Sequence, residues 1–187
     1  MRWTAAFFSQ TGSEILNIIN STGMVPDVII TNRLRKDRTL KNSEIINKEL
    51  LDRFGSRIVY IPVKPSIEDY KNALDGKGDG LISLHGYLRI LPPEICRKYS
   101  IVNLHPGLIT KYPILKGKDP QEKAYNLGLK TSGAVIHEVI AEVDSGKILD
   151  SIEISIEGLT LDEVYENLHK CSSDLWIKFF KEHILQW

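Results

Sequence analysis

The sequence predicts an α/β fold with an open, twisted, mostly parallel β-sheet and helices on both faces. Three observations support this prediction. Apolar runs of strand length alternate with helical segments through residues 3–104, which is the pattern of repeated strand–helix–strand units. Two strand-like segments joined by a short loop follow, which indicates an antiparallel pair near the C-terminal part of the sheet. One long helical segment then closes the chain.

The elements of the first half follow from periodicity and from their flanking turn residues. The predicted strands are residues 3–9, 25–31, 57–63, 80–84 and 99–104. The first predicted helix begins at Ser13, a candidate N-cap, and the others cover residues 43–54, 66–74 and 92–98. Ligands bind at the carboxyl ends of the strands in such sheets. Segments 9–13, 85–91 and 103–107 are therefore predicted to lie at one edge.

The second half has a different rhythm. Residues 108–118 are predicted to form a loop, residues 120–127 a helix, and residues 133–140 and 147–156 two strands. In the closing helix, residues 160–184, Thr160 is the predicted N-cap and Glu163 completes a capping box. Its predicted apolar stripe is Leu161, Val164, Leu168, Cys171 and Leu175. No internal repeat or linker is found, so we expect a single domain over residues 1–187.

Composition argues against several classes of partner. Lys+Arg 24 and Asp+Glu 24 balance, and no basic run occurs, so no nucleic-acid partner is expected. Cys96 and Cys171 have neither metal-site nor disulfide-framework spacing, so we expect reduced, half-buried thiols and no bound metal. With no signal peptide and no apolar stretch of membrane length, we expect a soluble, cytoplasmic monomer or homodimer without a membrane partner.

The segment Asn103-Leu-His105-Pro106-Gly107 carries the strongest chemical signal. Asn103 and His105 project on the same face of a predicted strand, just before Pro106 stops it. Asp144 follows in the loop between the last two predicted strands. An amide, an imidazole and a carboxylate supply an oxyanion donor, a proton-transfer group and a group that tunes it. The alternative is a hydrogen-bonded corner of the core.

Two other strand ends and one strand are candidates for binding. The turn at residues 9–13 leaves free N–H groups at a helix N-terminus and favours an anion, although Gly12 could simply make the turn and Glu14 would compete with a phosphate. Large apolar residues flank Arg89 in segment 85–91, which predicts a pocket wall for a flat heterocycle or a loop tucked under the next helix. His137 is predicted to support Asp144 or to be an ordinary core histidine.

Taken together, these segments resemble the folate-dependent formyltransferases, and most closely the glycinamide ribonucleotide transformylase branch. The resemblance covers nearly the whole chain in order, spacing and predicted secondary structure. The segments that carry it are Gly12-Ser13, Gly86-Tyr-Leu-Arg-Ile-Leu91, Asn103-Leu-His-Pro106, and Thr131-Ser-Gly133 with His137 and Asp144-Ser-Gly146.

The resemblance implies a formyltransferase fold, related to Rossmann folds, and a reaction. Asn103, a protonated His105 and Asp144 would stabilise a tetrahedral intermediate as a formyl group moves from 10-formyltetrahydrofolate to an amine, without a metal. The implied acceptor is small and phosphorylated, by default glycinamide ribonucleotide of purine biosynthesis. The implied donor-binding residues are Arg89, Ile90, Leu91, Ile140, Ala141 and Glu142. The implied acceptor-binding residues are Gly12, Ser13, Glu14, Pro106 and Gly107, with His137 in support.

The sequence departs from this branch on the acceptor side. Glu14 stands where the branch has asparagine, His85 replaces a small residue, and the loop at residues 107–118 is longer. Ser173 and Asp174 stand where the branch has a Glu-His pair. An amino sugar or sugar nucleotide is therefore the alternative acceptor. The alternative activities are hydrolysis of formyltetrahydrofolate and non-catalytic binding.

Overall fold

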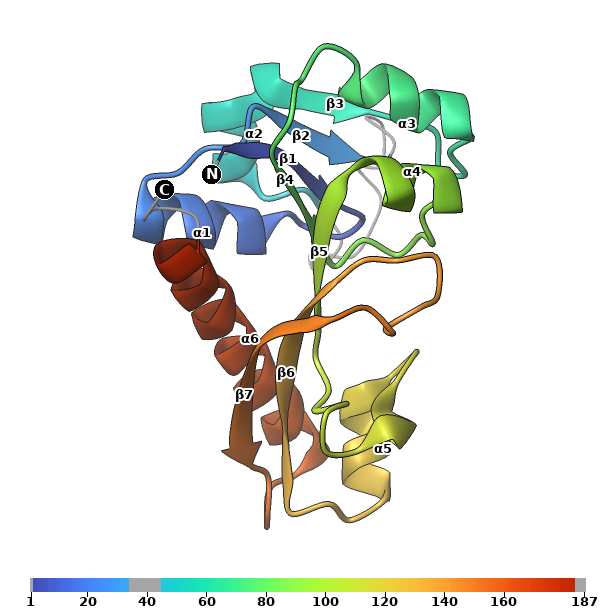
Figure 1. Cartoon of the computed structure of the whole chain (residues 1–187). Helices are drawn as coiled ribbons and strands as arrows, with labels where there is room; N and C mark the ends of the chain where they lie inside the picture. The colour runs from blue at the N-terminus through green and yellow to red at the C-terminus, as the bar shows by residue number, and fades with distance from the viewer. Residues whose placement is uncertain (1, 34–44, 184–187) are drawn as a thin grey trace.

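The computed structural model describes residues 2–33 and 45–183, and it contains a seven-stranded sheet in the order β3-β2-β1-β4-β5-β6-β7 (Figure 1). The strands are β1 (Trp3–Phe8), β2 (Val28–Thr31), β3 (Ile58–Tyr60), β4 (Leu81–His85), β5 (Ser100–His105), β6 (Thr131–Glu138) and β7 (Ile148–Ser155). Strands β1 to β5 pair in parallel, whereas β6 and β7 are antiparallel additions. The predicted fold class is confirmed.

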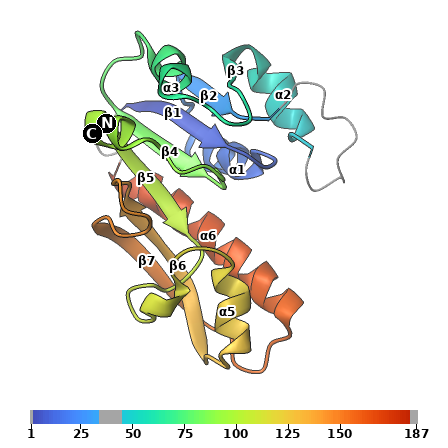
Figure 2. The same ribbon diagram turned by 90° about the vertical axis from the view of Figure 1, so that its right-hand side faces the viewer.

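Helices cover both faces of the sheet. They are α1 (Ser13–Thr22), α2 (Lys48–Phe54), α3 (Ile67–Leu74), α4 (Pro93–Lys98), α5 (Pro120–Asn126) and α6 (Leu161–His183), with short 3-10 turns η2 (Gly55–Arg57) and η3 (Pro113–Leu115). One face packs against α1 and α6 and the other against α3 and α4 (Figures 1 and 2). Phe8 lies in the first of these two cores and Phe7 in the second. Burial on both faces explains why the parallel strands are continuous apolar runs.

Helix α6 begins and packs as its sequence predicts. Thr160 and Glu163 form the capping box, since the Thr160 N–H donates to Glu163 Oε2 at 2.8 Å and the Glu163 N–H donates back to Thr160 Oγ1. Of the predicted stripe, Leu161 is half-buried and the remaining members are buried: Val164, Leu168, Cys171 and Leu175. The stripe continues through Trp176, Phe179 and Phe180.

Two helix starts differ from the prediction. Helix α2 begins at Lys48 rather than at residue 43, because the Asn47 side chain accepts the Leu50 N–H at 3.2 Å and caps the helix there. Residues 43 and 44 lie outside the described part of the chain. Ser13 is the first helical residue of α1 and not its cap, since Gly12 takes the N-cap position at φ 73°.

Several strands are shorter than predicted, and prolines account for two of the ends. Strand β2 begins at Val28, two residues after Pro26, and β3 ends at Tyr60, two residues before Pro62. Proline has no N–H to donate to a strand ladder. Other boundaries move by one or two residues, which leaves the order of elements as predicted.

The strand register brings the polar side chains together. Asn103 pairs with Leu84 on one neighbouring strand and with His137 on the other. His85 pairs with Phe8 at the end of β1, next to the turn that precedes α1. The carboxyl ends of β1, β4 and β5 therefore lie next to one another at one edge of the sheet, where the end of β5 pairs with β6.

Candidate active site

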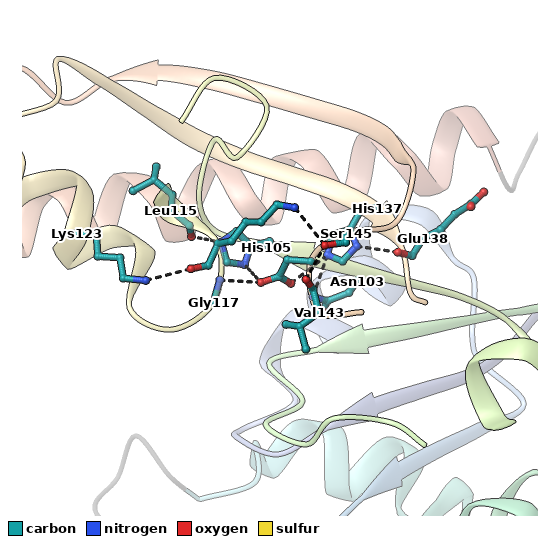
Figure 3. A network of polar contacts seen from close by, with 11 residues as sticks. Asn103, His105, Leu115, Gly117, Lys123, His137, Glu138, Val143 and Ser145 are labelled. Carbon is teal, nitrogen blue, oxygen red and sulfur yellow. Dashed lines mark hydrogen bonds and ion pairs between the residues drawn. The ribbon is translucent and has the colours of Figure 1, made fainter. Parts of the chain in front are cut away.

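A carboxylate between two histidines forms the centre of the site (Figure 3). Asp144 Oδ2 lies 3.3 Å from His105 Nδ1, and Asp144 Oδ1 lies 3.5 Å from His137 Nε2. The Asp144 side chain is 9% exposed, and both imidazoles are buried. The structure thus joins Asn103, His105, His137 and Asp144, although they come from β5, β6 and the loop before β7.

His105 is held so that only one of its ring nitrogens is free for chemistry. It is the last residue of β5, and its Nε2–H donates to the backbone carbonyl of Leu115 at 2.8 Å. Its Nδ1 faces Asp144. Gly107 packs against the same ring, since a Cβ there would lie 3.0 Å from His105 Nε2 and 2.8 Å from Pro120. Nδ1 is therefore the atom through which His105 can act.

His137 orients the amide of Asn103. The Nδ1–H of His137 donates to the carbonyl of Glu138 at 2.8 Å, so a neutral imidazole carries its lone pair on Nε2. Asn103 Nδ2 lies 3.4 Å from that nitrogen and donates one of its two hydrogens to it. The second amide hydrogen remains available to a ligand. His137 therefore contacts both Asn103 and Asp144 in addition to being buried.

The loop that carries Asp144 is fixed from two sides. The Gly117 N–H donates to Asp144 Oδ2 at 2.9 Å, and Lys116 Nζ donates to Ser145 Oγ at 3.1 Å. Asp144 has φ 50°, in the left-handed region that aspartate tolerates better than most residues. A Cβ at Gly146 would lie 1.8 Å from the Glu138 carbonyl oxygen, so only glycine fits this close approach.

Burial and hydrogen bonding set the charges in the site. Burial lowers the pKa of His105 below its ordinary value, and neither Asp144 nor the Leu115 carbonyl, which act in the opposite direction, offsets it. Burial alone would raise the pKa of Asp144, but the adjacent His137 and His105 and the Gly117 N–H hold it below its ordinary value. The neutral form of the resting His105 is therefore favoured at pH 7.

A pocket of about 190 Å³ opens beside Asn103, His137 and Asp144. Five of the six residues expected to bind the donor line it: Arg89, Ile90, Leu91, Ile140 and Glu142. Ala141 is exposed and is not among the lining residues. The other lining residues are Leu84, Tyr87, Leu88, Val139 and Val143. The prediction of a pocket wall in segment 85–91 is consistent with this geometry.

The expected acceptor residues lie at two neighbouring strand ends. Pro106 and Gly107 follow β5, and Gly12, Ser13 and Glu14 begin α1 after β1. The Ser13 N–H donates to Thr11 Oγ1 at 3.2 Å, so one donor of this helix terminus is already satisfied. Glu14 Oε2 lies 2.9 Å from His85 Nδ1.

Sequence reasoning missed the contributions of Leu115, Lys116 and Gly117. Leu115 and Gly117 act through a backbone carbonyl and a backbone N–H, which every non-proline residue possesses, so the sequence carries no signal for them. Lys116 is a loop lysine whose partner lies 29 residues away. The pairing of Glu14 with His85 was also missed, although both residues stood out as unusual.

Features outside the pocket bear on metals, thiols and membranes. In the described ranges, the one cluster of metal-ligand type is Asp150, Glu182 and His183, and Lys178 Nζ already contacts both Asp150 oxygens at 2.9 Å. Cys96 is half-buried and free, as expected, while Cys171 is free but fully buried. No helix within residues 2–33 and 45–183 is both long and apolar enough to cross a membrane.

Comparisons with known proteins assign this chain to a family. The sequence model of the family described as "Formyl transferase" matches residues 20–179. The chain is 33% identical over 93 residues to phosphoribosylglycinamide formyltransferase of Bacillus subtilis, covering 48% of this chain and 46% of that protein. It is 30% identical over 105 residues to formyltetrahydrofolate deformylase 2, mitochondrial, of Arabidopsis thaliana, covering 54% and 31%. The matches thus span about half, or less, of these relatives.

A solved structure shares the fold along almost the entire chain. Phosphoribosylglycinamide formyltransferase from Streptococcus pneumoniae TIGR4 superposes with a TM-score of 0.78 at 24% identity, over 97% of this chain and 98% of that chain. The family match, which extends over most of the sequence, confirms the resemblance drawn from the motifs. The chain belongs to the formyl transferase family, whose formyl donor is a folate derivative.

Proposed function

We propose that this protein transfers a formyl group from 10-formyltetrahydrofolate to the primary amine of a small acceptor, with residues 1–187 acting as one formyltransferase domain. The observation that carries the proposal is the position of Asp144 between His105 Nδ1 and His137 Nε2, with Asn103 at the wall of the same pocket. Glycinamide ribonucleotide is the first acceptor to test, because relatives named phosphoribosylglycinamide formyltransferase match the sequence and the fold.

Asn103 stabilises the charge that develops on the formyl oxygen. When the amine nitrogen attacks the formyl carbon, the carbonyl π bond breaks and its electron pair moves to the oxygen. The free N–H of the Asn103 amide donates to this oxyanion, because the other N–H is held by His137. One such pre-positioned donor is worth about 3 kcal/mol, or about 10²–10³ in rate.

His105 and Asp144 handle the proton that the amine loses. The neutral His105 accepts it at Nδ1, since Nε2 is occupied by the Leu115 carbonyl. The Asp144 carboxylate, 3.3 Å away, stabilises the imidazolium that forms. The proton then moves to the folate N10 as the bond between N10 and the formyl carbon breaks. The products are the formylated amine and tetrahydrofolate, and the balance requires no metal.

The pocket suits the donor by its combination of apolar and polar groups. The exposed side chains of Leu88, Ile90, Ile140 and Val143 surround its mouth. Arg89 Nε donates to the carbonyl of Val63 at 2.9 Å, which fixes the loop that forms one wall. A flat pterin ring between such apolar groups loses contact with water, while backbone groups of the two loops are available for hydrogen bonds.

Hydrolysis is the second candidate function, because a formyltetrahydrofolate deformylase is among the relatives at 30% identity. In that reaction water replaces the amine and formate replaces the formylated product. The same Asn103, His105 and Asp144 would serve it.

The two functions separate in one assay. The protein is incubated with 10-formyltetrahydrofolate alone, with glycinamide ribonucleotide, and with an amino sugar or its nucleotide, while tetrahydrofolate release is recorded. The proposal expects release only with an amine, together with one formylated amine for each tetrahydrofolate. Release at the same rate without an amine, accompanied by formate, would instead establish a hydrolase. Binding of the folate without release in any mixture would contradict both functions.

A further inference from the structure

We propose that the Glu14 carboxylate recognises the acceptor, favouring a molecule that presents a hydroxyl or ammonium group and disfavouring one that presents a phosphate. This inference rests on the proposed transfer to a small amine and concerns the substrate class of the same site. It starts from a buried chain of hydrogen bonds that runs from the core to the first turn of α1.

The chain consists of Trp3, Ser83, His85 and Glu14. The indole Nε1–H of Trp3 donates to Ser83 Oγ at 2.8 Å, Ser83 Oγ lies 2.7 Å from His85 Nε2, and His85 Nδ1 lies 2.9 Å from Glu14 Oε2. Trp3, Ser83 and His85 are buried. Trp176 packs on the His85 ring with a centroid separation of 4.6 Å, which fixes the plane of the imidazole.

Donor and acceptor chemistry gives this chain a direction. An indole N–H can only donate, so Ser83 Oγ must accept from Trp3. The Ser83 hydroxyl hydrogen is then free to be donated to His85 Nε2, and in that tautomer the imidazole proton lies on Nδ1, facing Glu14. A neutral imidazole therefore donates to a carboxylate. In this tautomer His85 orients the charge of Glu14 without cancelling it.

Half of the Glu14 carboxylate remains available to a ligand. Its side chain is 20% exposed, and within residues 2–33 and 45–183 Oε1 has no hydrogen-bond partner. An oxygen held in this way accepts a hydrogen bond from a hydroxyl or ammonium group. It also lies in the turn of α1 where backbone N–H groups would otherwise attract an anion.

The position of Glu14 relative to the donor pocket assigns it to the acceptor. Leu84 lines the pocket and belongs to the core under α3 and α4. The next residue, His85, faces the opposite side of the sheet, where it contacts Trp3 and Trp176 of the core under α1 and α6. The Glu14–His85 pair thus lies at the same strand ends as Asn103 but across the sheet from the pocket. A second substrate that meets a donor bound in the pocket approaches along this side.

The charge of Glu14 is strong enough to change the choice of acceptor. Two like charges about 4 Å apart near a protein surface repel with an energy that corresponds to between about 5-fold and about 10³-fold in binding, depending on the local dielectric. Glu14→Gln removes the charge, while the new amide oxygen still accepts the His85 N–H. Glu68→Gln is the matched control, because Glu68 is the second residue of α3 as Glu14 is of α1, and its side chain is 72% exposed.

The test compares glycinamide ribonucleotide with its dephosphorylated riboside. Dissociation constants are measured by calorimetry without a folate, and kcat/KM is measured with 10-formyltetrahydrofolate. For the wild type we expect the riboside to bind at least as tightly as the ribonucleotide. Glu14→Gln should shift the ratio toward the ribonucleotide by at least about 10-fold, whereas Glu68→Gln should leave it unchanged.

Three outcomes would overturn the inference. They are a wild-type preference for the ribonucleotide by more than 10-fold, an equal ratio in wild type and Glu14→Gln, and failure of both compounds to bind any variant. The binding readout keeps this inference separate from the proposed function. A ratio that shifts in binding without any formyl transfer supports the role of Glu14 and counts against the transfer reaction. Transfer with an unchanged ratio does the reverse.

Discussion

Replacing Asp144 by asparagine tests the proposed reaction most directly. Asparagine has nearly the same shape, tolerates the left-handed backbone at this position, and retains an oxygen for the Gly117 N–H. The change therefore removes the negative charge and little else. We expect the donor to bind with a dissociation constant within about threefold of wild type, because the pocket wall is preserved, and turnover to fall sharply.

The geometry gives the size of the effect. Opposite charges at the 3.3 Å separation of Asp144 Oδ2 and His105 Nδ1 attract by about 5 kcal/mol at an effective dielectric of about 20. His105 becomes charged only during the reaction, so this attraction stabilises the transition state and not the resting enzyme. Allowing for partial charge transfer, a loss of about 3–5 kcal/mol corresponds to a decrease in kcat of about 10²- to 5 × 10³-fold.

The assay records tetrahydrofolate release at saturating donor and amine, with donor binding measured separately. Glu138→Gln is the control, because it removes an exposed carboxylate beside His137 and leaves the backbone carbonyl in place. A second signature lies in the pH profile. Asp144 raises the pKa of His105, so its loss should move the acid limb of kcat to lower pH. Unchanged turnover, or an acid limb at higher pH, would refute the role given to Asp144.

Further predictions concern pH, a close backbone approach and the thiols. Because burial lowers the pKa of His105, wild-type kcat/KM should be constant down to about pH 6.5 and decline only at more acidic pH, as a rate–pH profile will reveal. Gly146→Ala should lower the free energy of unfolding by about 2–3 kcal/mol in urea, whereas Gly55→Ala, at φ −56° with open space around it, should stay within about 0.5 kcal/mol or stabilise. Cys96 should react with a thiol reagent in the native protein, whereas Cys171, whose pKa burial raises to about 11, should react only on unfolding.

The parallel part of the fold could be predicted because its strands are buried on both faces. Every residue of Trp3–Phe8 is buried, so the strand is an uninterrupted apolar run that few other structures produce. The predicted start of α2 was wrong for a local reason. Ile45 and Ile46 continue the apolar pattern of the helix, but the side chain of Asn47 caps it two residues later. Apolar periodicity indicates which positions are buried, but it does not indicate where the backbone hydrogen bonds of the helix begin.

The parts of the candidate site that lie within one segment of the sequence could be predicted, whereas contacts between segments could not. Asn103 and His105 follow from alternation within one strand, which the structure reproduces. The arrival of His137 opposite Asn103 depends on the register of an antiparallel pair 34 residues apart in sequence. Glu14 and His85 were two separate unusual residues in the sequence, and their contact became apparent only in the folded structure. The contacts between these site residues could not be predicted because the residues are far apart in the sequence, although each residue was recognised as a candidate.

The left-handed backbone at Asp144 narrows the amino acids that this position can hold. Glutamate would keep the negative charge, but its longer side chain would overreach both imidazoles, and it fits φ 50° less readily. Glycine would relax the turn and discard the charge. Proton transfer requires a negative charge at this position, and the tight bend requires a short side chain. Aspartate meets both requirements, so a substitution that abandons one of them also disturbs the site.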